Sequence, residues 1–371
     1  MADDDLAAGL RPKTTTRDHD DLKRRLQTWL AGRLPDGARP RVTALEVPVS
    51  NGLSSETVLF EAAWSDSGRD RSDALVARLA PDPDAVPVFP EYDLERQARV
   101  MRVVRETTTV PVPAVRWSEP DPAAVGTPFF VMERIEGRVP PDLLPYNMLG
   151  WLTEATAAQR AALQDATVAV LAALFAVDAP ETTFAFLRGD GDDPSALRRH
   201  RGGQRSYAGW VTEGIRLPLV DRMFAWLDDR WPTHEGPTVL SWGDSRIGNI
   251  IYRDFTPVAV LDWEMAALGP PELDLGWLVY MHRYFEHVAR QYGMPGLPDL
   301  LRADAVAGGF EHLTGYAPRD LDFYVMYAAL RHAVIMARIQ RRAIHFGEAV
   351  MPEDPDDLIT FRLLLEELMA G

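Results

Sequence analysis

Three polar residues stand at a spacing that suits phosphate chemistry. Asp244 and Asn249 lie five positions apart in the segment Ser-Trp-Gly-Asp-Ser-Arg-Ile-Gly-Asn. Asp262 follows a β-like run and belongs to the segment Val-Leu-Asp-Trp-Glu. A carboxylate, an amide oxygen and a second carboxylate can together orient a hydroxyl nucleophile and hold a metal-bound triphosphate. The set therefore indicates phosphoryl transfer from a nucleotide, and it leaves the acceptor open.

Each of these groups has a role that the reaction requires. Asp244 is the candidate for orienting the acceptor hydroxyl and accepting its proton. Asn249 is a neutral oxygen ligand on the same loop, and Asp262 offers a carboxylate to Mg²⁺, which prefers oxygen donors. Gly243 and Gly248 allow the backbone to bend tightly around the loop.

The order of the segments is more specific than any one of them. An Asp five residues before an Asn is common in turns and helix caps. Here Gly-Asp-x4-Asn is followed by a strand-like run, by Leu-Asp-Trp-Glu, and by Leu-Asp-Leu-Gly-Trp at residues 273–277. Packing alone does not require four acidic or amide residues around such apolar β segments.

Composition restricts the class of protein. The 371 residues are 46% hydrophobic and 25% charged, which is ordinary for a globular chain with room for two lobes. No apolar run reaches the length of about 18 residues that a membrane span needs. The absence of cysteine excludes disulfides, thiol nucleophiles and thiolate metal sites. A net charge of −16 argues against a nucleic-acid partner and mainly indicates solubility. The acidic start lacks the pattern of an export signal, so we expect a cytoplasmic protein.

The first part of the chain is predicted to be mostly strand. A helix begins at Asp18, with apolar residues at helical spacing, and ends near Gly32 and Pro35. One further helix is expected over residues 92–105. Strands are expected over residues 42–49, 57–64, 73–79, 110–117 and 128–133.

The rest of the chain is predicted to be mainly helical. We expect helices over residues 157–175, 273–292, 303–313 and 321–346, a helical pair over 207–231, and a helix at the C-terminus. Residues 180–205 read as a surface excursion, and short β segments are expected at 238–241, 249–252 and 257–261. The pattern predicts an α+β protein of two lobes with its chemistry in the cleft between them. The expected divisions are an N-terminal tail and helix (1–34), an N-lobe (35–134) and a helical C-lobe (135–371).

The block from Trp242 to Trp277 resembles the catalytic core of the aminoglycoside phosphotransferase family, small-molecule kinases built on the protein-kinase fold. The motifs in this block most resemble those of one subgroup, in some members of which the domain is fused or linked to acyl-CoA dehydrogenases. These motifs are Asp-x-Arg-Ile-Gly-Asn, Val-Leu-Asp-Trp-Glu-Met-Ala-x-Leu-Gly and Asp-Leu-Gly-Trp. It is also similar to mycobacterial proteins labelled aminoglycoside phosphotransferases. The resemblance runs from about residue 40 to the C-terminus and implies a protein-kinase-like bilobal fold, Mg²⁺, and ATP or GTP as phosphoryl donor.

The resemblance assigns roles in the C-lobe. Asp244 matches the catalytic aspartate of the family, and Asn249 and Asp262 match its metal ligands. Asp274 matches an acidic residue that supports the catalytic loop through backbone N–H groups. Arg246 and Glu264 are candidates for groups that support this set, and Glu264 is equally suited to contact metal or acceptor.

The resemblance also assigns nucleotide contacts in the N-lobe. The loop 50–55, with Ser54 and Ser55, would cover the phosphates, although a hairpin turn is the simpler interpretation of a loop with one glycine. Arg78 stands where kinases usually carry the lysine that grips the α and β phosphates, and its partner would be Glu95. An arginine keeps the charge with a different geometry, and an exposed strand residue is the alternative.

Two further features concern the base and the loop. The backbone of Glu133, Arg134 and Ile135 would face the edge of the adenine or guanine. Trp242 replaces the histidine that usually precedes Gly-Asp and braces the loop, and Phe175 likewise stands where many relatives have histidine. Both aromatic residues are expected to act in packing.

Acceptor contacts are expected from the helical lobe. The candidate residues are Tyr207, Trp210, His282, Tyr284, Arg331, His332, Arg338, Arg342 and His345. The cluster of Arg338, Arg341, Arg342 and His345 suits an anionic acceptor such as a hydroxyacyl-CoA, although a solvated helix face is the interpretation that we favour. A cleft lined with carboxylates would suit a cationic aminosugar.

Three functions remain open on the sequence. The first is a kinase that uses ATP or GTP to phosphorylate a hydroxyl of a small molecule. The second is a kinase-like module that binds nucleotide with little or no transfer, which Arg78 and Trp242 motivate. The third is a carboxylate-metal hydrolase that uses Asp244, Asp262 and Asp274. The sequence leaves the oligomeric state open.

Overall fold

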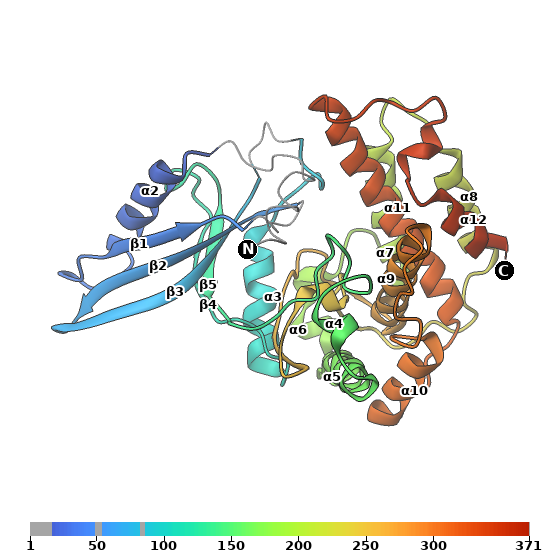
Figure 1. The fold of residues 1–371 in the computed structure, drawn as a ribbon, viewed down its shortest axis with the longest axis horizontal. Helices are drawn as coiled ribbons and strands as arrows, with labels where there is room; N and C mark the ends of the chain where they lie inside the picture. The colour runs from blue at the N-terminus through green and yellow to red at the C-terminus, as the bar shows by residue number, and fades with distance from the viewer. Residues whose placement is uncertain (1–16, 49–53, 82–85, 371) are drawn as a thin grey trace. The chain divides into compact units, whose positions relative to one another are not determined.

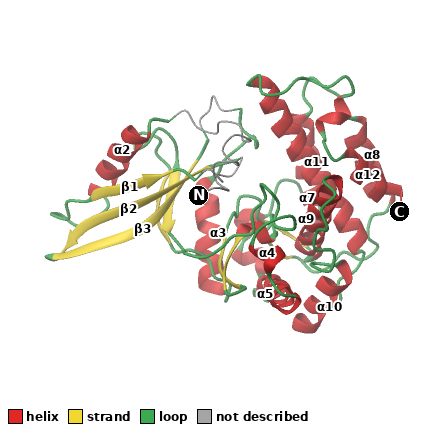
Figure 2. Ribbon diagram, in the orientation of Figure 1, coloured by secondary structure: helices red, strands yellow, loops and turns green. Residues whose placement is uncertain are grey.

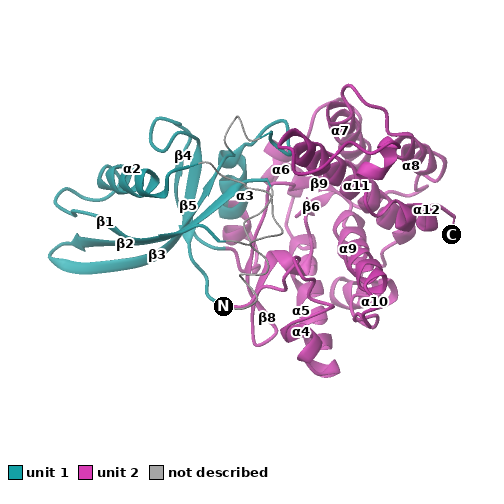
Figure 3. Cartoon of the chain, turned by 45° about the horizontal axis from the view of Figure 1, so that its top comes forward, with its two compact units in different colours: residues 1–102, 113–136 teal, residues 103–112, 137–371 magenta. Residues whose placement is uncertain are grey.

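The computed structural model describes residues 17–48, 54–81 and 86–370. The predicted tail before residue 17 and most of the loop 50–55 lie outside these residues. The chain forms two compact units, residues 1–102 with 113–136 (unit 1) and residues 103–112 with 137–371 (unit 2; Figure 3). Unit 1 is rich in strands and unit 2 is mainly helical (Figure 2), as the predicted α+β class requires. The helix expected to stand with the N-terminal tail lies within unit 1, and the division expected at residue 134 stays a prediction.

Unit 1 is built on a five-stranded antiparallel sheet in the order β1-β2-β3-β5-β4. The strands are β1 (Arg41–Glu46), β2 (Glu56–Asp66), β3 (Arg69–Leu79), β4 (Val115–Glu119) and β5 (Phe129–Glu133). Ser67 and Gly68 join β2 to β3 with φ angles of 52° and 80°, which suits a two-residue hairpin turn.

The strand expected over residues 110–117 begins later than predicted. Strand β4 starts at Val115 because Pro111 and Pro113 have no N–H to donate to a sheet ladder. Pro111 instead accepts a hydrogen bond at its carbonyl from Val260 N, at 2.7 Å. The segment before β4 therefore contributes to unit 2 rather than to the sheet.

Helix α2 (His19–Ala31) packs on this sheet (Figure 1). Asp18 caps its N-terminus by accepting hydrogen bonds from the N–H groups of Asp20 and Asp21. The buried apolar side chains of the helix, Leu22, Leu26, Trp29 and Leu30, join a core with Val58, Phe60, Phe129 and their neighbours. The amphipathic spacing read from the sequence thus gives the helix one face that is removed from water.

Unit 2 consists of helices and two small two-stranded sheets. Its helices are α4 (Trp151–Glu154), α5 (Ala157–Phe175), α6 (Pro180–Thr183), α7 (Ala196–Val211), α8 (Pro218–Asp229), α9 (Glu272–Gln291), α10 (Ala303–Thr314), α11 (Leu321–His345) and α12 (Arg362–Ala370), and α3 (Leu94–Thr107) runs from unit 1 into unit 2. Three short 3-10 helices cover Ala185–Leu187, Ile247–Asn249 and Pro355–Leu358. None of the helices in the described part of the chain is long and apolar enough to cross a membrane.

The surface excursion expected over residues 180–205 contains regular helix, with α6 at its start and α7 at its end. Helix α7 already begins at Ala196, where the Ser195 side chain accepts a hydrogen bond from Arg198 N and caps the helix. The glycines and arginines of this segment suggested a loop. The cap and the buried residues Ala196 and Leu197 outweigh the low helix propensity of the two glycines.

Two small antiparallel sheets carry the motifs of the sequence. Strand β6 (Val239–Ser241) pairs with β9 (Ala267–Gly269), and β7 (Ile250–Arg253) pairs with β8 (Thr256–Val260). The turn between β7 and β8 consists of two residues, Asp254 and Phe255, with φ angles of 50° and 63°. Strand β9 was not predicted, because three residues are too few to show a period.

Helices α9 and α11 pack closely at one glycine. A Cβ atom on Gly276 would lie 2.7 Å from the carbonyl carbon and from the Cβ of Tyr324 on α11. This spacing is below van der Waals contact, so the small residue sets how closely the two backbones approach. Both helices bury most of their residues around this point.

We predict that Gly276→Ala lowers the free energy of unfolding by about 1–3 kcal/mol, because the added methyl group forces the helices apart. The matched control is Gly203→Ala in α7, where a Cβ atom meets nothing within 4 Å. That substitution should stabilise the protein by about 0.5–1 kcal/mol through helix propensity. Urea denaturation of both variants checks the pair, and equal effects would contradict the packing argument.

Candidate functional site

The β7–β8 hairpin brings two of the predicted metal ligands together. Asn249 precedes β7 and Asp262 follows Leu261 at the end of β8, so both stand at the open end of the hairpin. Leu261 N donates to Asn249 O at 2.9 Å, which fixes the two chain segments side by side. Asp262 has a φ angle of 60°, in a region that residues with a side chain seldom adopt. A backbone conformation of this uncommon kind is often found at residues whose side chain must take a fixed orientation.

The Asp244 carboxylate is surrounded by hydrogen-bond donors. Trp277 Nε1 donates to Oδ1 at 2.7 Å, and Asn249 Nδ2 donates to Oδ2 at 2.6 Å. Arg246 Nε lies 3.2 Å from both oxygens. Asp244 is thereby held in one orientation next to Asn249, within one turn of the same loop.

Arg246 connects this loop to a residue that was not predicted from the sequence. Its Nη1 donates to Asp142 Oδ2, while its Nε faces Asp244. Burial opposes the charge of the guanidinium, but the two carboxylates outweigh it and raise the pKa of Arg246 above its usual range. The arginine therefore stays charged between two acidic groups.

The side chain of Asp274 holds the loop that carries Asp244 through hydrogen bonds. Its Oδ1 accepts from Ser241 Oγ at 3.0 Å and from Gly243 N at 2.9 Å, and its Oδ2 accepts from Trp242 N at 2.7 Å. Its own carbonyl accepts from Ser245 Oγ at 2.7 Å. Burial raises the pKa of Asp274, and the donated hydrogen bonds act in the opposite direction.

Asp274 and Trp277 act from the same side of α9. They stand three positions apart, which places their side chains on one face of the helix. Asp274 contacts the backbone of the loop and Trp277 contacts the Asp244 carboxylate. This spacing within Leu-Asp-Leu-Gly-Trp was available in the sequence, and it indicates how Trp277 could have been identified.

Trp242 links the loop to the second acidic segment. It is fully buried and packs against Trp263, with ring centroids 5.9 Å apart. Its Nε1 donates to the carbonyls of Leu261 and Asp262, at 2.9 Å and 3.2 Å. The indole therefore provides a directed hydrogen bond as well as packing. Phe175, on α5, packs in the expected manner against Phe310 and Tyr316.

Arg331 of α11 braces the loop from another side. It is buried, donates to Gly243 O at 2.9 Å, and stacks over Trp277 at 4.4 Å from the ring centre. The sequence suggested Arg331 as an acceptor contact. In the structure it is buried and contacts the backbone of the loop that carries Asp244. Gly243 itself has a φ angle of 91°, and a Cβ atom there would lie 2.0 Å from Met265 O. A side chain at this position is excluded both by the backbone conformation and by space.

The donor set at the hairpin fits a hard cation. Asn249 supplies an amide oxygen and Asp262 a carboxylate, and Mg²⁺ commonly binds one or two protein carboxylates plus phosphate oxygens and water. In the described residues no three His, Cys, Asp or Glu side chains gather as a metal site. Glu264, two residues on, is half-buried.

The predicted nucleotide contacts lie in unit 1. Arg78 Nη1 donates to Thr57 Oγ1 at 2.8 Å, whereas Glu95 is exposed on α3, so their pairing stays a prediction. Ser55 is buried, and its hydroxyl has no hydrogen-bond partner among the residues that the structure describes. Ser54 is half-buried beside it.

The segment predicted to face the adenine or guanine of the nucleotide begins at the last residue of strand β5. Glu133 closes β5, and its N–H donates to Ala114 O at 3.0 Å while its side chain accepts from Ala114 N at 2.8 Å. Arg134 N donates to Ala74 O at 3.1 Å. Ile135 follows and is half-buried.

Several expected acceptor contacts are part of the protein core. His282 and His332 are buried, and burial lowers the pKa of both, in His332 to about 3. His282 is hydrogen-bonded to the hydroxyl of Tyr146, and His332 is hydrogen-bonded to the hydroxyl of Tyr280.

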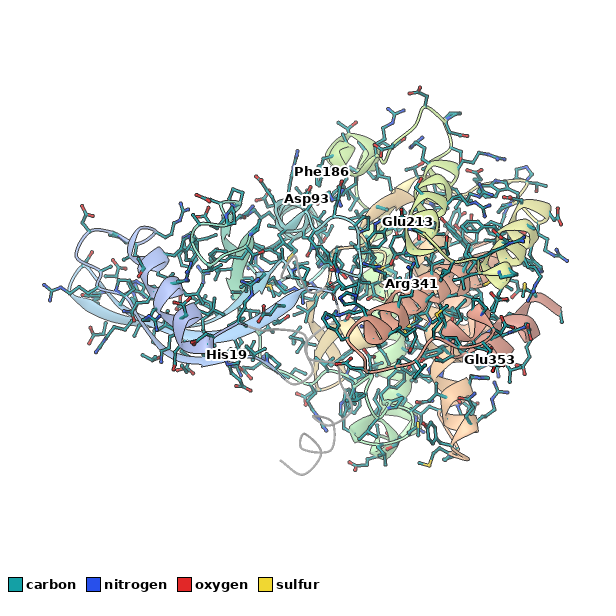
Figure 4. All side chains as sticks on the ribbon, turned by 90° about the horizontal axis from the view of Figure 1, so that it is seen from above. His19, Asp93, Phe186, Glu213, Arg341 and Glu353 are labelled. Atoms are coloured by element: carbon teal, nitrogen blue, oxygen red, sulfur yellow. The ribbon has the colours of Figure 1, made fainter. Side chains whose placement is uncertain are left out.

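The solvated helix face expected for the basic cluster of α11 is wrong for most of its members. Arg342 is 5% exposed, and Arg338 stacks over Trp210 at 4.2 Å. Arg341, labelled in Figure 4, donates to Val211 O at the end of α7. Only His345 is exposed.

We predict that Asp274→Asn lowers the free energy of unfolding by about 1–3 kcal/mol, because an amide group leaves at least one buried N–H or O–H donor without an acceptor. The control is Asp304→Asn, an exposed residue paired only with Arg302, which should change stability by less than about 0.5 kcal/mol. Urea denaturation at neutral pH measures both. A loss in the control as large as in Asp274→Asn would contradict this prediction.

Comparison with known proteins places the chain among phosphotransferases. Residues 46–321 match the sequence profile of the phosphotransferase enzyme family. Acyl-CoA dehydrogenase family member 10 of Mus musculus is 25% identical over 282 residues, which is 73% of this chain and 24% of that protein. Acyl-CoA dehydrogenase family member 11 of Gallus gallus is 28% identical over 256 residues, which is 68% of this chain and 30% of that protein. The chain thus spans less than a third of the length of these relatives.

Solved structures show the same fold. A protein of Ralstonia eutropha described as an aminoglycoside phosphotransferase has a TM-score of 0.63 and 24% identity, and the match covers 93% of this chain and 96% of that one. Macrolide 2′-phosphotransferase MphH of Brachybacterium faecium has a TM-score of 0.55 and 22% identity, with 90% and 97% covered. The predicted protein-kinase-like fold, with its β-rich first unit and helical second unit, is confirmed. Because the family profile covers well over half of the sequence and includes Asp142, Asp244, Asn249, Asp262 and Asp274, the chain belongs to the phosphotransferase enzyme family.

Proposed function

We propose that this protein is a Mg²⁺-dependent kinase that transfers the γ-phosphoryl group of ATP or GTP to a hydroxyl group of a small molecule. The observation that carries the proposal is the arrangement of Asp244, whose carboxylate is held by Trp277 and Asn249 directly beside the hairpin end that bears Asp262. A base and two oxygen ligands in one small volume meet the needs of phosphoryl transfer, which depends on positioning and on charge stabilisation.

Related folds support a nucleotide as the donor. Solved structures with this fold include the GDP complex of aminoglycoside 2′-phosphotransferase-IIIa, with a TM-score of 0.56 and 16% identity. They also include a mutant of aminoglycoside phosphotransferase APH(4)-Ia in a ternary complex with ADP and hygromycin B, with a TM-score of 0.52 and 16% identity. In this chain Ser54, Ser55 and Arg78 are the proposed phosphate contacts, and the backbone of Glu133 and Ile135 is the proposed contact of the base.

In the proposed reaction Asp244 accepts a hydrogen bond from the acceptor hydroxyl and takes its proton as the oxygen attacks the γ-phosphorus. The bond from the γ-phosphorus to the β,γ-bridging oxygen breaks, and ADP or GDP leaves. Arg246 places a positive charge beside the carboxylate. Asp274 and Trp277 hold the loop and the base so that little reorganisation accompanies the reaction. Asn249 and Asp262 would hold Mg²⁺, which when bound neutralises charge on the phosphate oxygens.

Two acceptor classes are supported by relatives. Solved phosphotransferases with this fold bind aminoglycosides, such as kanamycin in the GDP complex of APH(2″)-IIIa. The curated relatives carry the name acyl-CoA dehydrogenase, which supports a hydroxyacyl-CoA as the acceptor. Both are alcohols, so both are compatible with the proposed role of Asp244.

A kinase-like module that binds nucleotide with little or no transfer is the alternative. Arg78, which stands where kinases usually carry a lysine, and Trp242, in place of a histidine, favour it, because the geometry of an arginine on the phosphates differs from that of a lysine. The two proposals agree on nucleotide binding and differ in turnover.

We predict that Asp244→Ala reduces kcat for nucleotide-dependent phosphorylation by about 10²- to 10⁴-fold, the usual contribution of a general base. Binding of the Mg-nucleotide should change little, because Asn249 and Asp262 remain. Turnover is measured against aminoglycosides, hydroxyacyl-CoAs and other hydroxylated metabolites, and binding by calorimetry. Asp304→Asn serves as the control with full activity. Turnover that is unchanged in Asp244→Ala would reject the assignment of the base, and nucleotide binding without turnover in the unmodified protein would favour the alternative.

A further inference from the structure

Arg246 forms ion pairs with both Asp142 and Asp244, and the two pairs differ in geometry. Arg246 Nη1 donates directly to Asp142 Oδ2, whereas its Nε is shared between the two oxygens of Asp244 at 3.2 Å each. A shared and longer contact is weaker than the two parallel bonds that a guanidinium usually makes with a carboxylate. Asp142 thus draws the arginine away from a bidentate contact with Asp244.

The lone pairs of Asp244 show why this geometry matters. A carboxylate offers about four acceptor positions. Trp277 takes one on Oδ1 and Asn249 takes one on Oδ2. A bidentate arginine would take the remaining two, and no position would be left for an incoming hydroxyl. With Arg246 held by Asp142, those positions are only weakly engaged.

Gly248 provides the space for this arrangement. A Cβ atom at position 248 would lie 2.6 Å from Arg246 Nη1 and 2.6 Å from Asp142 Oδ1. Its φ angle is outside the left-handed region, so the backbone conformation does not require glycine here. The requirement for a small residue comes from the ion pair itself.

Asp142 has little other structural work in the described residues. Its only hydrogen-bond partner there is Arg246, and its Oδ1 is buried without a partner. The side chain is 37% exposed overall, compared with 19% for Arg246 and 15% for Asp244. Because its one hydrogen-bond partner among the described residues is Arg246, the arrangement points to a role of Asp142 in placing the arginine.

We infer that Asp142 is a positioning residue, which holds the Arg246 guanidinium beside Asp244 so that the carboxylate keeps room for the acceptor hydroxyl. The inference rests on the proposed function, which it extends with a residue 104 positions before Arg246 in the chain. Loss of Asp142 lets Arg246 form a bidentate pair with Asp244. Without Asp142, binding of the acceptor hydroxyl to Asp244 and transfer of its proton become slower, and nucleotide binding does not change.

The first test is a double-mutant cycle of stability with Asp142→Asn, Arg246→Gln and the double variant. It requires no acceptor and reports only whether the two side chains interact. We expect the shifts in melting temperature to be non-additive by at least about 2 °C, which is the size of effect that a single interaction gives in a unit of this length. Additive shifts would overturn the inference, whatever the activity of the protein.

The second test is the division of the effect between kcat and KM. Asp142→Asn should lower kcat by about 10- to 100-fold, because small misplacements of catalytic groups have costs of this size, and the KM for nucleotide should stay within about 2-fold. Gly248→Ala should reproduce this pattern without a change of charge, and Asp142→Glu should restore part of the rate. In the Arg246→Gln background, Asp142→Asn should have no further effect.

Other outcomes separate the two proposals. A rate loss in Asp142→Asn that persists in the Arg246→Gln background would overturn the inference, because Asp142 would then act by another route. Equal loss in Asp304→Asn, the exposed control, would overturn it as well. An unmodified protein without turnover on any acceptor would reject the proposed function, and the stability cycle would still decide whether Asp142 holds Arg246.

Discussion

The buried carboxylate of Asp274 is the interaction on which the candidate site depends. It lies at the start of α9, within the core of unit 2, and accepts three hydrogen bonds from the loop that carries Asp244. Taking a carboxylate out of water is costly, and the cost is offset only while all of these donors are present. The loop and the helix are therefore tied together, and Trp277, one turn further along α9, carries the same rigidity to Asp244 itself.

Constraints on the backbone complete this arrangement. Gly243 turns the chain in a conformation and a space that admit no side chain, and Asp262 is held in the left-handed region. The indole of Trp242 joins the two segments by donating to Leu261 and Asp262. The two chain segments on either side of the β7–β8 hairpin are thus tied together, and the spacing between the proposed base and the proposed metal ligands is set by the backbone rather than by side-chain flexibility.

Much of this could be predicted from the sequence, for reasons that particular residues make clear. The amphipathic spacing of Leu22, Leu26 and Leu30 predicted helix α2, and the apolar runs next to Asn249 and Asp262 predicted two short β segments, which pair in the structure as the β7–β8 hairpin. Local pattern is sufficient where neighbours in space are neighbours in sequence. The late start of β4 follows from Pro111 and Pro113 and could also have been derived.

Contacts between distant segments were not accessible in this way. Asp142 lies in a segment rich in proline and leucine that carries no periodic signal, and its partner is 104 positions away. Arg342 belongs to a cluster that reads as a basic, solvated helix face, and Arg331 was expected to contact the acceptor, yet both are buried. A charge pattern on a helix indicates exposure only when nothing packs on that face, and this information resides in α7, α9 and the loop of Asp244 rather than in α11.

The replacement of histidine by Trp242 illustrates how such distant contacts maintain a site. A histidine before Gly-Asp would brace the loop with one polar group. Here the indole N–H bonds to two carbonyls, and Arg331 adds a hydrogen bond to Gly243 O from the opposite side. Arg331 also stacks over Trp277, the residue that orients Asp244. The bracing is thus distributed over an aromatic residue in the loop and a buried cation on another helix.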